Sequence, residues 1–188
     1  RARDVVAPID GFHDAVRALG VRIVHIRSVL RPGGLDDIHG IPSAWRRTFP
    51  LHVGAIPNAD AHAIEGSRWT EWVTRVEPGD MRVDTKRRLS AFYPTDLDFL
   101  LRNQRIETVV LNGGFTDCCV LNTAFDANNR NYRVIVLRDL VRGTDAHLEG
   151  AALAMVSLHL GLVMDSRELL DQWGGAPRHG SSPSPSLS

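Results

Sequence analysis

The chain has 188 residues, 43% of them hydrophobic, with 22 basic and 22 acidic side chains. A chain of this size and composition is typical of one globular domain with a sizeable core. The balanced charge argues against nucleic acid as a partner, and no apolar stretch approaches the roughly 18 residues that a membrane span requires.

Helical and strand patterns alternate along the first half of the sequence, on either side of a long irregular segment. Residues 10–20 place apolar side chains at helical spacing and end at a glycine, and residues 21–26 are rich in β-branched residues, as in a strand. Residues 27–67 show no clear period; irregular stretches of this length are uncommon in compact domains, so this one is either functional or only partly irregular. Residues 68–76 predict a short amphipathic helix and residues 80–85 a weak strand.

The second half predicts a regular succession of short apolar strands and helices. Helices are expected over residues 94–104, 116–131, 145–161 and 166–173, and strands over 108–112, 133–139 and 162–165. This alternation is typical of a parallel sheet with helices on both faces. We therefore expect an α/β fold, a three-layer αβα sandwich with a mostly parallel, doubly wound, Rossmann-like sheet. It would form one domain over residues 1–174, followed by a Ser/Pro/Gly-rich tail at 175–188.

Both cysteines of the chain, Cys118 and Cys119, stand side by side just after a Gly-Gly turn. Adjacent cysteines cannot cross-link distant parts of a fold, which favours a reducing, cytoplasmic setting. They belong to the first turn of a predicted helix, at the sheet edge where α/β folds bind ligands. The N–H groups and partial positive charge of a helix start stabilise a thiolate and can receive an oxyanion. Cysteine is also a common core residue, so position alone leaves both a nucleophile and an apolar filler open.

The segment GGFTDCCVLNTAFDA, residues 113–127, resembles the signature of the isochorismatase-like cysteine hydrolases. Residues 84–113, DTKRRLSAFYPTDLDFLLRNQRIETVVLNG, are similar to the lysine segment of that superfamily, and residues 131–156 continue the likeness. The resemblance extends from about Asp10 to Trp173. Within the superfamily, the N-carbamoylsarcosine amidases and the biuret and ureidoacrylate hydrolases are the better models.

The resemblance implies roles for particular residues. Cys119 matches the nucleophile and Lys86 the lysine beside it, whereas Cys118 has no matching role and is expected to pack against the sheet. The peptide bond between Gly114 and Phe115 is expected to be cis, with the backbone amides of Phe115 and Cys119 forming the oxyanion hole. A cation close to a helix-terminal thiol favours the thiolate, which agrees with both assignments.

The third catalytic residue of the family is an aspartate at the end of a first strand. Neither Asp4 nor Asp10 fits, because no apolar strand precedes Asp4 and Asp10 lies at the start of the first predicted helix. We expect this strand and its aspartate upstream of Arg1, since a domain without that central strand would expose two sheet edges.

No metal and no other cofactor is expected. Nicotinamidases of the same family bind a metal through an aspartate and two histidines. The nearest candidates here are Asp36, Asp37 and His39, which lack a second histidine at a suitable spacing, although His52 and His62 lie in the same region. This argues against a nicotinamidase. Isochorismatases proper cleave a vinyl ether and commonly lack the cysteine.

The expected reaction is therefore cysteine-dependent hydrolysis of a C–N bond in a small amide, carbamoyl or ureido compound, through a thioester. Candidate substrate contacts are Phe115, Phe92, Arg27 and Trp45; an arginine suits a substrate carboxylate, although each arginine is equally compatible with a solvated surface. The family also implies a homo-oligomer, a dimer or tetramer. The alternatives are an inactive binding or assembly protein, a vinyl-ether hydrolase, and a flavodoxin-like cofactor binder, for which no phosphate-binding glycine motif is present.

Overall fold

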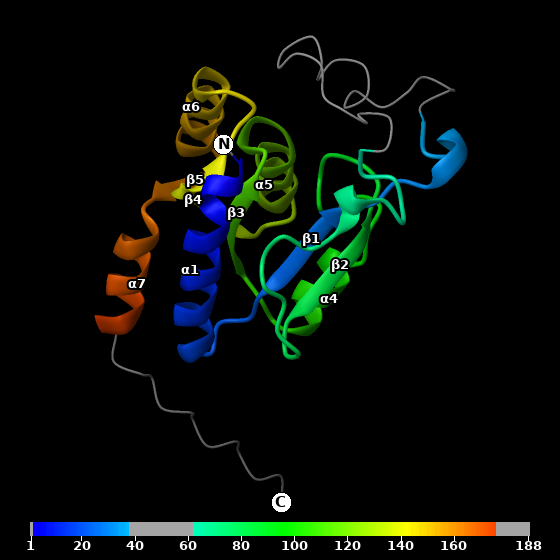
Figure 1. The fold of residues 1–188 in the computed structure, drawn as a ribbon. Coiled ribbons are helices and arrows are strands. Elements are labelled where there is room, and N and C mark those ends of the chain that lie inside the picture. Colours follow the sequence, from blue (N-terminus) through cyan, green and yellow to red (C-terminus); the bar gives the residue numbers. More distant parts are fainter. Residues whose placement is uncertain (1, 38–61, 176–188) are drawn as a thin grey trace, which may run out of the picture.

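The computed structural model describes residues 2–37 and 62–175, in which strands and helices alternate along the chain (Figure 1). The strands are β1 (Val24–Ser28), β2 (Met81–Lys86), β3 (Thr108–Gly114), β4 (Arg133–Arg142) and β5 (Gly161–Met164). The α-helices are α1 (Val6–Ala18), α4 (Leu97–Asn103), α5 (Leu121–Asn129), α6 (Ala146–Met155) and α7 (Ser166–Gly175). Short 3₁₀ turns are η1 (Ala2–Val5), η2 (Pro32–Gly34) and η4 (Arg68–Thr70), and π-helical turns are η5 (Thr116–Val120) and η6 (Val156–Leu160).

The two faces of β4 pack against different helices, which makes the fold a three-layer α/β sandwich. Side chains alternate along a strand, so Val134 and Val136 belong to a core with α4, α5 and η6. Ile135 and Leu137 belong to a second core with η1, α1 and α7. Figure 1 shows helices on both sides of the strands. The predicted fold class is confirmed.

All the recorded strand pairs are parallel, but they form two sheets instead of the expected single sheet. β1 pairs with β2, and β3, β4 and β5 pair in that order. Within the described residues, β1 and β3 each have one edge that pairs with no other strand. Because strand edges carry unpaired N–H and C=O groups, such edges could pair with a further strand.

The helix predicted over residues 68–76 is wrong. Only η4 forms, and the chain is already extended at Glu71, with φ −69° and ψ 146°. The ring of Trp72 packs edge-on against His25, with 5.8 Å between centroids, and the Arg27 guanidinium lies 4.6 Å from its centroid. These contacts to β1 outweigh the amphipathic pattern of the segment. The expected tail lies outside the described residues except for Gly175.

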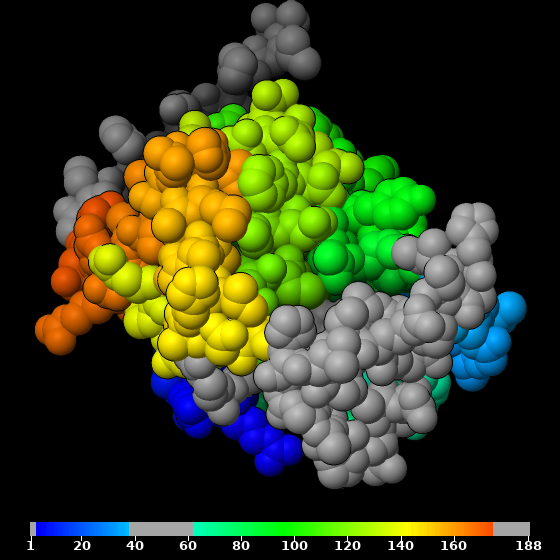
Figure 2. Space-filling model, turned by 90° about the horizontal axis from the view of Figure 1, so that it is seen from above, coloured from blue at the N-terminus to red at the C-terminus, as the bar shows by residue number. Residues whose placement is uncertain are grey.

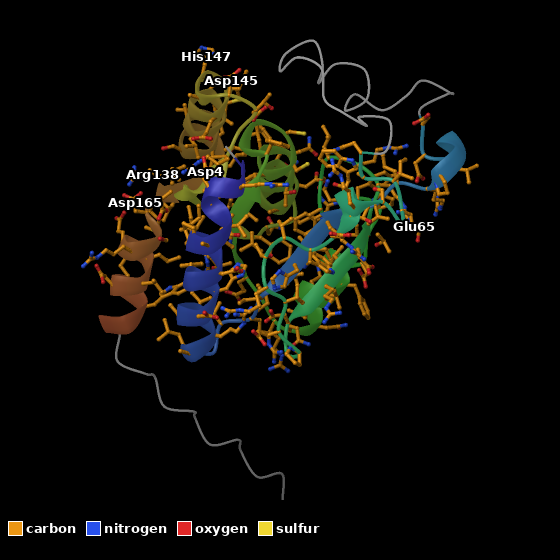
Figure 3. All side chains as sticks on the ribbon, viewed as in Figure 1. Asp4, Glu65, Arg138, Asp145, His147 and Asp165 are labelled. Atoms are coloured by element: carbon orange, nitrogen blue, oxygen red, sulfur yellow. The ribbon has the colours of Figure 1, made fainter. Side chains whose placement is uncertain are left out.

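A polar contact caps the start of α6 and an ion pair lies beside the start of α7; Figure 3 labels Asp145, Arg138 and Asp165. Asp145 caps α6 by accepting a hydrogen bond from the backbone N–H of Leu148 at 2.8 Å, a contact that contributes about 1 kcal/mol. Arg138 of β4 pairs with Asp165, just before α7, at 2.9 Å. Both of these side chains are about half exposed, so the ion pair itself adds little stability. Within the described ranges, no helix is both long and apolar enough to cross a bilayer.

Gly161 allows β5 to lie close to β4. A Cβ atom at this position would stand 2.1 Å from the backbone oxygen of Val134. We expect Gly161→Ala to lower the free energy of unfolding by about 3 kcal/mol, because β5 would have to move away from β4. The matched control is Gly150→Ala in α6, where a Cβ would meet open space. Alanine there should stabilise the helix by about 0.8 kcal/mol. Urea unfolding would measure both, and equal midpoints would contradict the steric argument.

Candidate active site

Three strands end beside one small cavity. Ser28 is the last residue of β1, Lys86 of β2 and Gly114 of β3. The cavity has a volume of about 160 Å³. Its lining consists of Ile26, Ser28, Lys86, Ala91, Leu111, Asn112, Gly114, Cys119, Val120 and Thr123. It therefore occupies the carboxyl ends of parallel strands, where α/β folds bind ligands.

The side chain of Lys86 connects two of these strands to the nucleophile predicted from the sequence. Its Nζ donates hydrogen bonds to Ser28 Oγ at 2.8 Å and to Cys119 Sγ at 3.4 Å. Lys86 is only 4% exposed. A buried ammonium group needs compensation for lost hydration. Of these two acceptors the hydroxyl is neutral, so the sulfur is the one that can carry the opposing negative charge.

The helix start that carries the cysteines is tied to Phe115. The Gly114–Phe115 peptide bond is cis, as predicted. Phe115 is extended, with φ −97° and ψ 142°, and its carbonyl accepts hydrogen bonds from the N–H groups of Cys118 at 3.2 Å and Val120 at 3.1 Å. Cys118 and Cys119 thus lie in the π-helical turn η5, a type of turn that is frequent at functional sites.

The electrostatics of this turn favour a thiolate on Cys119. A hydrogen bond from Cys118, together with the charge and hydrogen bond of Lys86 and a hydrogen bond from the Phe115 backbone, lowers the pKa of Cys119 to about 6 although burial opposes ionisation. The same sulfur contact and burial raise the pKa of Cys118. The environment therefore favours the thiolate of Cys119 over that of Cys118, and the thiolate is the form in which a cysteine is nucleophilic.

Asp117 holds η5 to the loop between β4 and α6. Its Oδ1 accepts a hydrogen bond from the backbone N–H of Thr144 at 2.7 Å, and its Oδ2 accepts one from the Thr144 hydroxyl at 2.8 Å. A Cβ on Gly143 would come 2.7 Å from the same carboxylate. Figure 2 shows the segments of α5 and α6 side by side on this face. Asp117 therefore has a structural role next to the site.

The four candidate substrate contacts are not all brought together. Phe115 directly follows Gly114, which lines the cavity, but Phe115 itself is not among the described lining residues. Arg27 instead lies over Trp72. Phe92 is 5% exposed and belongs to the core, where its ring stacks on Tyr132. Neither side chain is in the lining of the cavity as the structure describes it. Trp45 lies outside the described residues.

Ser28 is the site residue that sequence reasoning missed. The predicted strand ended at Ile26, whereas β1 continues to Ser28. A polar residue that closes an apolar strand at the carboxyl edge of the sheet is a signal that could have identified it. Its hydroxyl fixes the position of the Lys86 ammonium.

The described residues after β1 do not decide whether a metal binds, because only some of the candidate ligands are among them. His39 and His52 lie outside the described residues. Both Asp36 carboxylate oxygens accept hydrogen bonds from Arg31, at 2.6 and 2.9 Å, and His62 packs against Trp69. In residues 2–37 and 62–175, no group of three or more His, Cys, Asp or Glu side chains is placed to hold a metal ion.

A larger hollow of about 370 Å³ includes Thr85 and Arg87, the two neighbours of Lys86 in the chain. The other lining residues are Arg31, Asp36, Arg88, Tyr93 and Pro94. Three arginines and one aspartate therefore line this hollow, which gives it a surplus of positive charge.

Comparison with known proteins identifies the family of the chain. The model of the isochorismatase domain matches residues 1–168. The ureidoacrylate amidohydrolase of Methylorubrum extorquens is 33% identical over 159 residues, which cover 80% of this chain and 62% of that protein. The N-carbamoylsarcosine amidase of an Arthrobacter species is 27% identical over 138 residues, 73% of this chain and 49% of that protein. The chain therefore spans less than two thirds of the length of either relative.

The fold recurs in a solved structure. The crystal structure of a cysteine hydrolase from Pseudomonas syringae pv. phaseolicola matches with a TM-score of 0.76 and 26% sequence identity, over 91% of this chain and 80% of that chain. The layered fold described above is thus similar to that of a cysteine hydrolase.

Proposed function

Because the chain belongs to the isochorismatase family, we propose that it is a cysteine-dependent amidohydrolase that cleaves a C–N bond of a small amide, carbamoyl or ureido compound. The observation that carries the proposal is the 3.4 Å contact between Lys86 Nζ and Cys119 Sγ at the wall of the cavity. A buried cation against the sulfur at a helix start is the environment that makes a cysteine reactive.

In the first step, the Cys119 thiolate attacks the carbonyl carbon of the substrate. The backbone N–H groups of Phe115 and Cys119 then stabilise the oxyanion of the tetrahedral intermediate. One observation supports the role of the Phe115 N–H group. In the protein without substrate, a hydrogen bond from the Phe115 backbone already contributes to the low pKa of Cys119. The C–N bond breaks as the aspartate predicted upstream of Arg1, which holds the proton taken from the Cys119 thiol, donates that proton to the nitrogen; ammonia or an amine leaves and a thioester remains.

In the second step, water hydrolyses the thioester and releases the acid and the Cys119 thiolate. A general base has to activate this water. None of the described lining residues is a carboxylate or a histidine, and Asp117 is engaged by Thr144. We propose that the aspartate predicted from the sequence supplies this base, on a strand that completes the layer between β1 and β3.

The test is hydrolysis of a substrate panel by the full-length protein. Ureidoacrylate, N-carbamoylsarcosine and biuret would be compared with isochorismate, a vinyl ether. We expect ammonia from at least one of the amides, and hydroxylamine should intercept the thioester as a hydroxamate. Turnover of isochorismate alone would favour the vinyl-ether reaction. Absence of ammonia together with an unreactive Cys119 would favour a binding protein.

A further inference from the structure

The two sulfur atoms of the cysteine pair are in contact. Cys118 Sγ lies 3.8 Å from Cys119 Sγ, within hydrogen-bond distance for sulfur. Successive side chains on a regular α-helix point about 100° apart and do not face one another. In this chain both residues lie in the π-helical turn η5, and their thiol groups meet. The two thiol groups therefore face one another in this turn.

The surroundings decide which sulfur keeps a proton. Lys86 donates to Cys119 Sγ, so the negative charge is best stabilised there. The hydrogen bond with Cys119, burial and, to a smaller extent, the Asp117 carboxylate all raise the pKa of Cys118 and disfavour a charge on it. Two thiolates at this separation would also repel each other. Cys118 therefore remains a thiol when Cys119 ionises, and its S–H group can donate a hydrogen bond to that thiolate.

We propose that Cys118 donates an S–H hydrogen bond to the Cys119 thiolate and so activates the nucleophile. This proposal rests on the proposed function, because it gives Cys118 a part in the same site. The apolar filler expected from the sequence is replaced by an activating partner. The hydrogen bond from Cys118 is the largest single contribution that lowers the pKa of Cys119.

The experiment is the pH dependence of iodoacetamide labelling, quantified separately for Cys118 and Cys119 by peptide mass spectrometry. Wild-type protein should label at Cys119 with a midpoint near pH 6. In Cys118→Ala the midpoint should rise by about one pH unit, the size expected for losing a weak donor to a charged group. Cys118→Ser keeps a donor and should recover most of this shift.

Leu121→Ala is the matched control, because it removes partly buried packing from the next turn of the same helix and leaves both sulfur atoms in place. Its Cys119 midpoint should equal that of the wild type. If Cys118→Ala has an unchanged midpoint, Cys118 only fills space and the proposal fails. A wild-type midpoint near the ordinary value of about 8.5 would instead overturn the proposed function itself.

A measurement on the wild type keeps the proposal testable even if the alanine variant does not fold. Cys118 should label far more slowly than Cys119 at every pH up to about 9, because it retains its proton beyond the ordinary cysteine pKa. Labelling of Cys118 at a rate equal to or above that of Cys119 would place the thiolate on the wrong sulfur and overturn the proposal.

Discussion

Replacement of Cys119 by serine is expected to abolish amide hydrolysis by the full-length protein. The value of kcat/KM should fall on the order of 10⁴-fold or more, as is typical when an enzyme loses its nucleophile. A serine hydroxyl does not ionise near neutral pH, so the charge and hydrogen bond of Lys86 no longer produce an anion. Initial rates of ammonia release on the best substrate of the panel would measure the loss.

The control for this variant is Cys118→Ser, which makes the same chemical change one residue away. It should keep most of the activity because it retains a hydrogen-bond donor beside Cys119. The thermal midpoints of both variants should stay near that of the wild type, since serine is close in size to cysteine. Activity of Cys119→Ser above about a tenth of the wild-type value would mean that another group attacks the substrate.

Replacement of Lys86 by methionine is expected to lower kcat/KM by about 10²–10³-fold, the typical cost of removing one charge-stabilising donor. Methionine preserves the length of the side chain and removes its charge. The cation beside Cys119 lowers the pKa of that thiol. Without it, the pKa should rise toward about 8.5, so less thiolate is present at pH 7 and part of the lost activity should return near pH 9.

A measurement of stability distinguishes loss of thiol activation in Lys86→Met from unfolding of the variant. Lys86 is buried, and replacing a buried charge with an apolar side chain of similar volume is often neutral or stabilising. Arg82→Met is the matched control, because it removes one positive charge from an exposed position of the same strand. The iodoacetamide midpoint of Cys119 should move upward in Lys86→Met and stay in place in Arg82→Met. An unmoved midpoint in both variants would show that Lys86 does not activate the thiol.

The sequence by itself determined the fold class and the central residues of the candidate site. Periodicity of apolar residues is a local property, so the alternation of strands and helices was readable without a structure. The position of Cys119 after a strand and a Gly-Gly turn, and the motif around it, pointed to the helix start. The cis bond between Gly114 and Phe115, predicted from the same motif, is confirmed.

Only the tertiary structure decided which distant side chains meet. Ser28 and Lys86 are 58 residues apart, and their contact depends on the pairing of β1 with β2. Trp72 is not in the helix predicted from the sequence, because its contacts with His25 and Arg27 of β1 outweigh the amphipathic pattern of its own segment. Within the π-helical turn η5, the Cys118 and Cys119 sulfur atoms lie 3.8 Å apart, a contact that the sequence alone does not show. Such contacts follow from packing between segments and from backbone geometry, which composition and spacing do not encode.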